Sequence, residues 1–281
     1  MKLTHTLMLT MAVAGFLTLA IIPSCTKTKT TIQTQTDTVR DTTIQVDTVA
    51  PLGDTTWKHL RDSLWAYYPI NGNLSDSTPN NHVLTLNGGA ALTYDMWGNA
   101  NYAIDLPGGS AYGQINDGEN FTAPDFSVTF YMMPIAVSGE FFGKQDWATN
   151  DGAVWNVDVD PVNSPNVFKF NVTNNQSAVC TGPPGTATAA SCNSNLLQPY
   201  SWYQIAVSFN QTTGLEKLYI NGQLQGTNTI NQTITCDVGQ FILGNQWAGG
   251  SSAFTGRMSQ LRIYTRALTD HEVAYLFQYH L

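Results

Sequence analysis

Short runs of alternating apolar and polar residues, separated by turn residues, fill the chain from residue 57 onward. Phe126–Phe130 and Phe168–Val172 show this alternation most clearly, and it is typical of strands with one buried face. The pattern predicts strands at Leu64–Pro69, Tyr102–Leu106, Tyr112–Ile115, Phe126–Met132, Glu140–Lys144, Ala153–Val159, Val167–Val172, Tyr203–Phe209, Glu216–Ile220, Gln240–Leu243 and Gly256–Tyr264. Many strands with little helix predict an all-β, two-sheet antiparallel sandwich.

Two local sequence motifs predict a tight turn and a helix within this sandwich. Asn221-Gly222 lies between two predicted strands, and a tight type I′ hairpin needs a positive φ at both of its central residues. Near the end of the chain, Thr269 precedes Glu272 by three residues, which is the spacing of a helix capping box. The sequence therefore predicts a hairpin at residues 221–222 and a short C-terminal helix.

The first 24 residues have the pattern of an export signal. Lys2 precedes an apolar run from Leu7 to Ile22 that is short for a membrane span, and Ser24-Cys25 follows it. The Cys directly after a small residue resembles the lipobox of bacterial lipoproteins. That resemblance implies cleavage before Cys25 and lipidation of Cys25, which would attach the protein to a membrane. The alternatives are a plain secretory signal and an uncleaved anchor.

Residues 25–56 form a Thr-rich segment without any aromatic side chain. Such a composition buries too little apolar surface to offset the entropy of ordering, so we expect a disordered tether after the lipidated Cys25. The remaining residues, 57–281, are long enough for one domain with a substantial core.

The charge and composition narrow the class of partner. The chain has a net charge of −8, only 11% charged residues and no Lys/Arg cluster, which argues against a nucleic-acid partner. The surface must then consist largely of Asn, Gln, Ser, Thr and Gly. This composition favours an uncharged partner rich in hydroxyl groups.

Cysteine usage agrees with export. Cys180 and Cys192 bracket a turn-rich loop, and we favour a disulfide between them, with Cys236 left as a buried thiol. Bridges from Cys236 to Cys180 or to Cys192 are the alternatives.

Four segments of the domain resemble a known family. They are LWAYYPINGNLSDSTPNNH (64–82), FSVTFYMMP (126–134), SWYQIAVSFNQTTGLEKLYINGQL (201–224) and FTGRMSQLRIYTRALTDHEVAYLF (254–277). In this order they resemble the laminin G-like, concanavalin A-like lectin/glucanase jelly-roll domain. The resemblance implies two antiparallel sheets whose first and last strands pair. Because this fold carries lectins, adhesion modules and glycosidases, function has to be argued from the site.

The family's glycosidases use alternate carboxylates on one strand, roughly Glu-x-Asp-x-Glu. Here the equivalent strand holds Asn156, Asp158 and Asp160, which share one face. Retaining hydrolysis needs a nucleophilic carboxylate and an acid about 5 Å apart, and Asn156 supplies neither. We therefore expect no enzymatic activity, with solvated Asp residues on an outward face of this strand or at its end.

Loop tryptophans with polar neighbours are the candidate binding groups, because sugars stack on aromatic rings and pair their hydroxyls with amides and carboxylates. The alternative is that the loop tryptophans cover a sheet edge, and Trp155 faces either a groove or the core. The candidate ligand-binding residues are Lys144, Asp146, Trp147, Asn150, Asp151, Trp155, Asn245 and Trp247.

The resemblance also implies a calcium site between the Asn-Gly-Asn segment and the last strands. Asn71, Asn73 and Asp76 supply oxygens for it. Ser259-Gln260 stands where the family often has two Asp, which weakens the site. Without a metal, the segment is an Asx-rich turn whose side chains cap backbone groups.

Together these features predict a non-catalytic, glycan-binding lipoprotein of the bacterial cell envelope, anchored in the outer membrane on its surface or periplasmic face. A protein-binding adhesion module and a glycoside hydrolase are the alternative functions.

Overall fold

Two antiparallel sheets and two short helices make up the described part of the protein. The computed structural model describes residues 56–146, 152–160, 162–173, 187–230, 239–246 and 252–280. The first sheet has eight strands: β1 (Leu64–Tyr68), β3 (Ala91–Thr93), β4 (Ala103–Pro107), β6 (Phe126–Pro134), β11 (Tyr203–Asn210), β12 (Leu215–Ile220), β13 (Gln223–Thr229) and β15 (Thr255–Tyr264). The second has seven: β2 (Leu84–Asn87), β5 (Tyr112–Ile115), β7 (Gly139–Asp146), β8 (Gly152–Val159), β9 (Val167–Thr173), β10 (Ala187–Asn193) and β14 (Gln240–Leu243).

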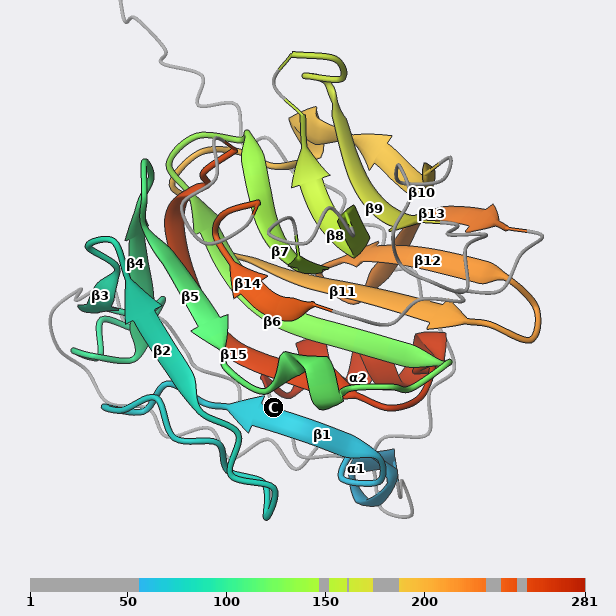
Figure 1. Ribbon diagram of the computed structural model, residues 1–281, viewed down its shortest axis with the longest axis horizontal. Coiled ribbons are helices and arrows are strands. Elements are labelled where there is room, and N and C mark those ends of the chain that lie inside the picture. The colour runs from blue at the N-terminus through green and yellow to red at the C-terminus, as the bar shows by residue number, and fades with distance from the viewer. Residues whose placement is uncertain are drawn as a thin grey trace, which may run out of the picture. The chain divides into compact units, whose positions relative to one another are not determined.

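The strand order is that of a jelly-roll sandwich (Figure 1). The eight-stranded sheet runs β13-β12-β11-β6-β15-β4-β3, and the seven-stranded sheet runs β10-β9-β8-β7-β14-β5-β2. The first strand, β1, pairs with the last strand, β15, with Leu64 opposite Tyr264. This pairing confirms the expected fold, and it joins the two ends of the domain in one sheet.

The core lies between the sheets and is rich in aromatic rings. Alternate residues of β8 and β9 point into it, so Trp155, Val157, Phe168 and Phe170 are buried. Trp155 stacks on Phe126 of the opposite sheet, with ring centroids 5.0 Å apart. Because these side chains alternate with polar ones, the inner face of each strand supplies the apolar surface that holds the sandwich together.

Helices cover the outer face of the eight-stranded sheet. The helix α2 (Asp270–Gln278) packs Val273 and Leu276 with the buried side chains of Tyr219 and Tyr264 from the sheet. Its predicted capping box is present: the Thr269 hydroxyl accepts from the Glu272 amide, and the Glu272 carboxylate accepts from the Thr269 amide. The shorter α1 (Thr56–His59) adds one turn, and two 3₁₀ turns, Gly118–Asn120 and Ser194–Leu196, complete the elements. Within the described residues, every helix is too short or too polar to cross a membrane.

Every strand expected from the alternation pattern is present, and the Asn221-Gly222 turn has the predicted positive φ angles of 52° and 73°. Four additional strands, β2, β3, β10 and β13, were not expected. They occupy or adjoin the edges of the two sheets, and small or polar residues dominate β10 and β13. Their strand conformation depends on pairing with a neighbour rather than on their own apolar pattern.

Candidate functional site

The described residues of the predicted tryptophan-loop site are buried. Trp155 is 1% exposed and belongs to the core, so its assignment as a ligand contact is wrong. The physical reason is strand parity: Trp155 shares a face with Val157 and Val159, and that face points inward. Lys144 is fully buried as well, because the strand register places it between Trp155 and Phe241. Neither side chain offers a surface to a ligand.

Asn245 is also buried, and its side chain has a structural role. Its amide nitrogen donates to the Gly109 carbonyl at 3.0 Å, and its oxygen accepts from the Gln246 amide. The prediction that Asn245 contacts a ligand is therefore wrong, because its amide fastens the segment after β14 to the turn at Gly109.

The other predicted contacts fall outside the described residues: Trp147, Asn150, Asp151 and Trp247, together with the side chain of Asp146. The strand ends that flank them are described and lie far apart. Asp146 ends β7, whereas the amide of Glu140, near the start of β7, donates to the Ser252 carbonyl. Six residues of strand separate these points, which is roughly 20 Å at 3.3 Å per residue. The described residues that flank the two segments, Asp146 and Ser252, thus lie at opposite ends of β7.

Cys192 carries a free thiol and packs against the core at the end of β10. Burial raises the pKa of this thiol to about 11. Its side chain turns inward with Ala190. The expected Cys180–Cys192 bridge stays a prediction, because Cys180 lies outside the described residues, as do Cys236 and Cys25.

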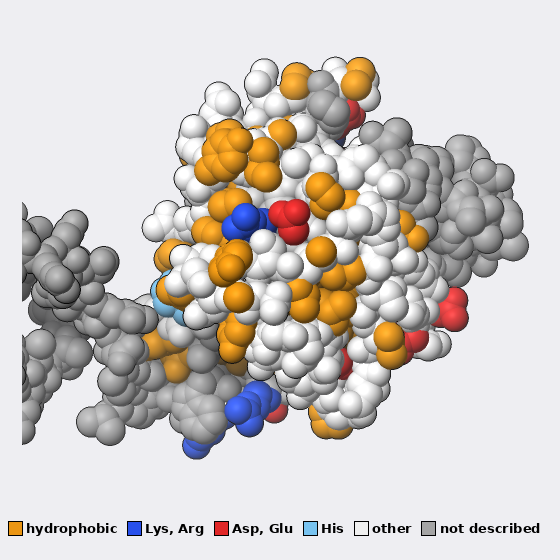
Figure 2. Space-filling model, turned by 90° about the vertical axis from the view of Figure 1, so that its left-hand side faces the viewer, with side chains coloured by type: hydrophobic (Ala, Val, Ile, Leu, Met, Phe, Trp, Pro, Cys, Tyr) orange, Lys and Arg blue, Asp and Glu red, His pale blue; other side chains and the backbone are white. Residues whose placement is uncertain are grey.

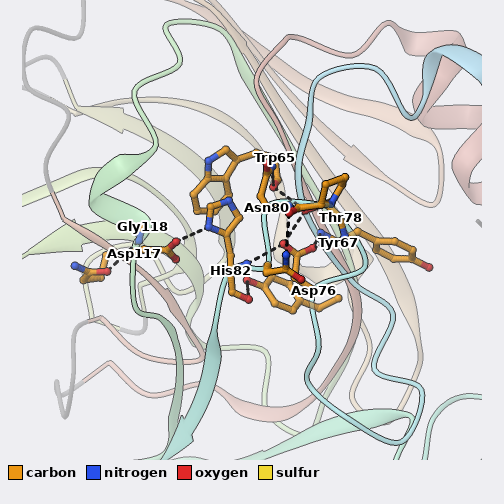
Figure 3. A network of polar contacts seen from close by, with 12 residues as sticks. Trp65, Tyr67, Asp76, Thr78, Asn80, His82, Asp117 and Gly118 are labelled. Atoms are coloured by element: carbon orange, nitrogen blue, oxygen red, sulfur yellow. Dashed lines mark hydrogen bonds and ion pairs between the residues drawn. The ribbon is translucent and has the colours of Figure 1, made fainter.

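The Asx-rich segment after β1 serves the backbone rather than a metal. The Asp76 carboxylate accepts four hydrogen bonds, from the amides of Tyr67, Thr78 and His82 and from the Thr78 hydroxyl (Figure 3). Asn71 and Asn73 use their side-chain oxygens within the same turn. These oxygens are occupied by protein donors and do not fit the predicted calcium site. No group of three or more His, Cys, Asp or Glu in the described ranges is placed to hold a metal.

The same segment protects the free edge of β1. The Ser77 amide donates to the Tyr67 carbonyl, and the Asn80 side chain donates to the Trp65 carbonyl. His82 stacks on Trp65 with ring centroids 3.6 Å apart, and its Nδ1 lies 2.5 Å from the Asp117 carboxylate (Figure 3). Because unpaired strand edges invite pairing with other chains, this network closes an edge that would otherwise be open.

A polar cluster lies on the outer face of the seven-stranded sheet. Asn156 and Asp158 of β8 point away from the core, as predicted from their shared face, and Lys169 and Asn171 of β9 lie beside them. The Asn171 amide nitrogen donates to the Asn156 oxygen at 3.0 Å and to Asp158 at 3.3 Å. The Asn156 nitrogen donates to Asp158 at 3.2 Å, and Lys169 Nζ is 3.6 Å from that carboxylate.

Some donors and acceptors of this cluster have no hydrogen-bond partner within the described protein. Both of its contacts use the Asn171 amide nitrogen, so within the described protein the Asn171 oxygen has no donor. Asn156 has one N–H left over, and Lys169 meets only one carboxylate. All four residues are half-buried, and the side chains of Lys169 and Asp158 are 19% and 17% exposed. The cluster presents both donors and acceptors on the outer face of the sheet.

The carboxylates of this face are already engaged. Burial raises the pKa of Asp158, and this effect is opposed by Lys169 and by the two amides. Glu140 of β7 lies directly opposite Asp158, yet it is buried and has partners of its own. Asp160, at the end of β8, accepts from the amides of Val162 and Asn163, and the Asn163 contacts hold its pKa below the usual value.

An exposed aromatic hairpin was missed by the sequence reasoning. The loop between β3 and β4 carries Tyr94, Trp97 and Tyr102, which are 56%, 48% and 39% exposed. The buried Asp95 carboxylate organises the loop by accepting from the amides of Trp97 and Asn99. The signal was present in the sequence as three aromatic residues within a Gly- and Asn-rich turn. Figure 2 shows the side of the molecule on which β3 and β4 lie. Hydrophobic groups lie there among uncharged polar surface, and charged side chains are few.

Comparison with known proteins supports the fold assignment. The chain belongs to the concanavalin A-like lectin/glucanases superfamily, whose family model matches residues 107–274. A search of functionally described proteins gave no match.

Solved structures give the same fold. Domain 4 of AbnA, a GH43 extracellular arabinanase from Geobacillus stearothermophilus determined with arabinotriose, is 24% identical with a TM-score of 0.57, covering 77% of this chain and 98% of that domain. The binding domain of Paraclostridial Mosquitocidal Protein 1 is 19% identical with a TM-score of 0.59, covering 79% of this chain and 53% of that one. The receptor binding domain of a botulinum neurotoxin C/D mosaic serotype is 12% identical with a TM-score of 0.57, covering 77% and 51%. The present chain thus spans about half the length of the toxin domains.

Proposed function

We propose that this protein is a non-catalytic carbohydrate-binding protein, held in the bacterial cell envelope by a lipid on Cys25. The observation that carries the binding half is the polar cluster of Asn156, Asp158, Lys169 and Asn171 on the outer face of the seven-stranded sheet. Its free groups include an acceptor on Asn171 and donors on Asn156 and Lys169. A sugar hydroxyl is both donor and acceptor, so neighbouring hydroxyls of one sugar can meet both kinds of group.

The state of the carboxylates supports binding over cleavage. A retaining glycosidase needs one carboxylate free to attack and a second free to deliver a proton, about 5 Å apart. Asp158 is held by Asn156, Asn171 and Lys169, and Glu140 is buried with its own partners. Neither group is both free and accessible, so we infer that a bound glycan is retained and not hydrolysed.

Affinity electrophoresis of the purified protein through gels containing a panel of neutral polysaccharides tests this proposal. We expect retardation by at least one polysaccharide, which Asn171→Ala reduces at least about fivefold, corresponding to roughly 1 kcal/mol for a lost hydrogen bond. Asn228→Ala, on the other sheet, is the matched control and leaves retardation unchanged. Unretarded migration through every gel would contradict the proposal, as would equal retardation of the Asn171 variant.

A protein-binding adhesion module is the second candidate, and the exposed hairpin of Tyr94, Trp97 and Tyr102 favours it. Aromatic residues are enriched at protein interfaces, and the Asp95 carboxylate accepts hydrogen bonds from two backbone amides of this loop. A defined protein partner that is lost with Trp97→Ala and retained with Asn171→Ala would favour this function over glycan binding.

The lipid anchor rests on the sequence pattern around Cys25. Radiolabelled palmitate incorporated into the native protein and absent from Cys25→Ser tests it. Protease treatment of intact cells then tells whether the domain faces the exterior or the periplasm.

A further inference from the structure

A pocket lies on the opposite side of the sandwich from the polar cluster. It has a volume of about 530 Å³ and is formed where β1, β15 and α2 meet on the outer face of the eight-stranded sheet. Leu60, Leu64 and Leu276 provide apolar walls, and two arginines, Arg61 and Arg262, line the same space. None of its described lining residues is acidic, although the chain as a whole has a net charge of −8.

Arg262 is the central group of this pocket. It is 6% exposed, and its guanidinium lies 4.0 Å over the ring of Tyr67. Its one hydrogen bond in the described structure is long, 3.4 Å from Nη1 to the Gln260 carbonyl, and no carboxylate there lies within ion-pair distance of it. A guanidinium has five N–H donors, and a buried charge without a counter-charge is costly. The unused donors of Arg262 therefore face a space without an anion.

Tyr264, which also lines the pocket, likewise has an unused hydrogen-bond donor. Its hydroxyl is buried and finds no hydrogen-bond partner among the described residues. Burial raises the pKa of this hydroxyl to about 12, so it remains a proton donor at neutral pH. Arg61 stands exposed at the rim and adds a second positive charge. Hydrogen-bond donors and positive charge thus lie around one space.

We propose that this pocket binds a carboxylate-bearing sugar, such as one uronic acid unit of an acidic glycan. The planar guanidinium of Arg262 matches a carboxylate, which accepts two parallel N–H bonds from such a fork. The leucine walls suit the C–H surface of a sugar ring, and the volume lies within the roughly 300–1,000 Å³ of small-molecule sites. This site is separate from the Asn171 cluster, so it adds selectivity for acidic glycans to the proposed function.

Calorimetric titration of the purified protein with galacturonate, galactose and acetate tests the proposal. Galactose has the same ring with a hydroxymethyl in place of the carboxylate, and acetate is the carboxylate alone. We expect galacturonate to bind at least tenfold more tightly than either. Arg262→Gln should weaken galacturonate binding at least tenfold and Arg61→Gln about two- to fivefold. Arg257→Gln is the matched control and should have no effect, because Arg257 lies beside Asp105, away from the pocket.

The wild-type protein provides a readout that does not depend on the folding of a variant. Galacturonate should shift the Arg262 Nε–H resonance in a side-chain NMR spectrum and leave that of Arg257 in place. Equal affinity for galactose, or galacturonate binding that survives Arg262→Gln, would overturn the proposal. Equal affinity for acetate would overturn the assignment of a sugar. Retardation by neutral polysaccharides through Asn171 does not depend on any of these results.

Discussion

Gly222 of the β12–β13 turn lies directly against Phe277 of α2. A Cβ placed on Gly222 would be 3.0 Å from the Phe277 Cβ and 3.1 Å from the Ala274 Cα. The Asn221-Gly222 turn therefore does two things: it closes a hairpin, and it leaves room for the helix that covers the sheet.

This contact predicts that Gly222→Ala is more destabilising than its backbone conformation alone requires. An Ala at positive φ costs about 1–2 kcal/mol, and the contact with α2 should add at least about 1 kcal/mol. Gly72→Ala is the matched control, because Gly72 also has a positive φ, 94°, but nothing lies within 4 Å of its added Cβ. Chemical denaturation of both variants measures the difference, and equal losses of unfolding free energy would contradict the packing.

The helix cap predicts a pH-dependent contribution to stability. Burial acts to raise the pKa of Glu272, but hydrogen bonds from Arg266 and Thr269 outweigh it and hold this pKa below its usual value. A carboxyl whose pKa is lowered by folding stabilises the folded state above its unfolded pKa, about 4.3, and loses that effect as pH falls through the folded pKa.

We therefore expect Glu272→Gln to lower the unfolding free energy by about 1–2 kcal/mol at pH 7 and to have progressively less effect below about pH 4. Thermal unfolding of the two proteins across this range measures the difference. A difference that stays constant down to pH 3 would show that the charge of Glu272 has no role in the cap.

Cys192 should remain a thiol in the native protein. Because burial raises its pKa to about 11, little thiolate forms at pH 8, and alkylation of the folded protein should be slow. After unfolding without reductant, alkylation should be rapid, and mass spectrometry should find a modified Cys192 peptide. A Cys192 peptide linked to Cys180 or to Cys236 would instead support a disulfide.

The fold could be predicted because the central strands alternate apolar and polar residues, and this alternation shows which face of each strand is buried. Phe126–Phe130 alternates between apolar and polar residues because one face of the strand packs against the core. Thr269 and Glu272 predict the start of the helix because each side chain caps the backbone amide of the other residue. Strand β10 has no such alternation in its sequence. Its small residues are held by pairing with β9, a contact between segments that local sequence does not encode.

The site was predicted only in part, for a related reason. The shared face of Asn156 and Asp158 follows from strand periodicity, and parity with Val157 could also have placed Trp155 in the core. The partners Lys169 and Asn171 come from the next strand, so only the register of β8 on β9 brings them to Asp158. Likewise, Arg262 has no described carboxylate partner because of the groups that β1 and α2 bring beside it, which local sequence does not encode.

The most direct test of the central claim, binding without cleavage, follows one polysaccharide through a single incubation. The polysaccharide that retards the protein most is held with wild-type protein and with Asp158→Ala, and both bound protein and released reducing ends are measured. We predict saturable binding by the wild-type protein, weakened in the variant, with no reducing ends above those of a protein-free sample. Reducing ends released by the wild-type protein and lost with Asp158→Ala would contradict this account and identify a glycosidase.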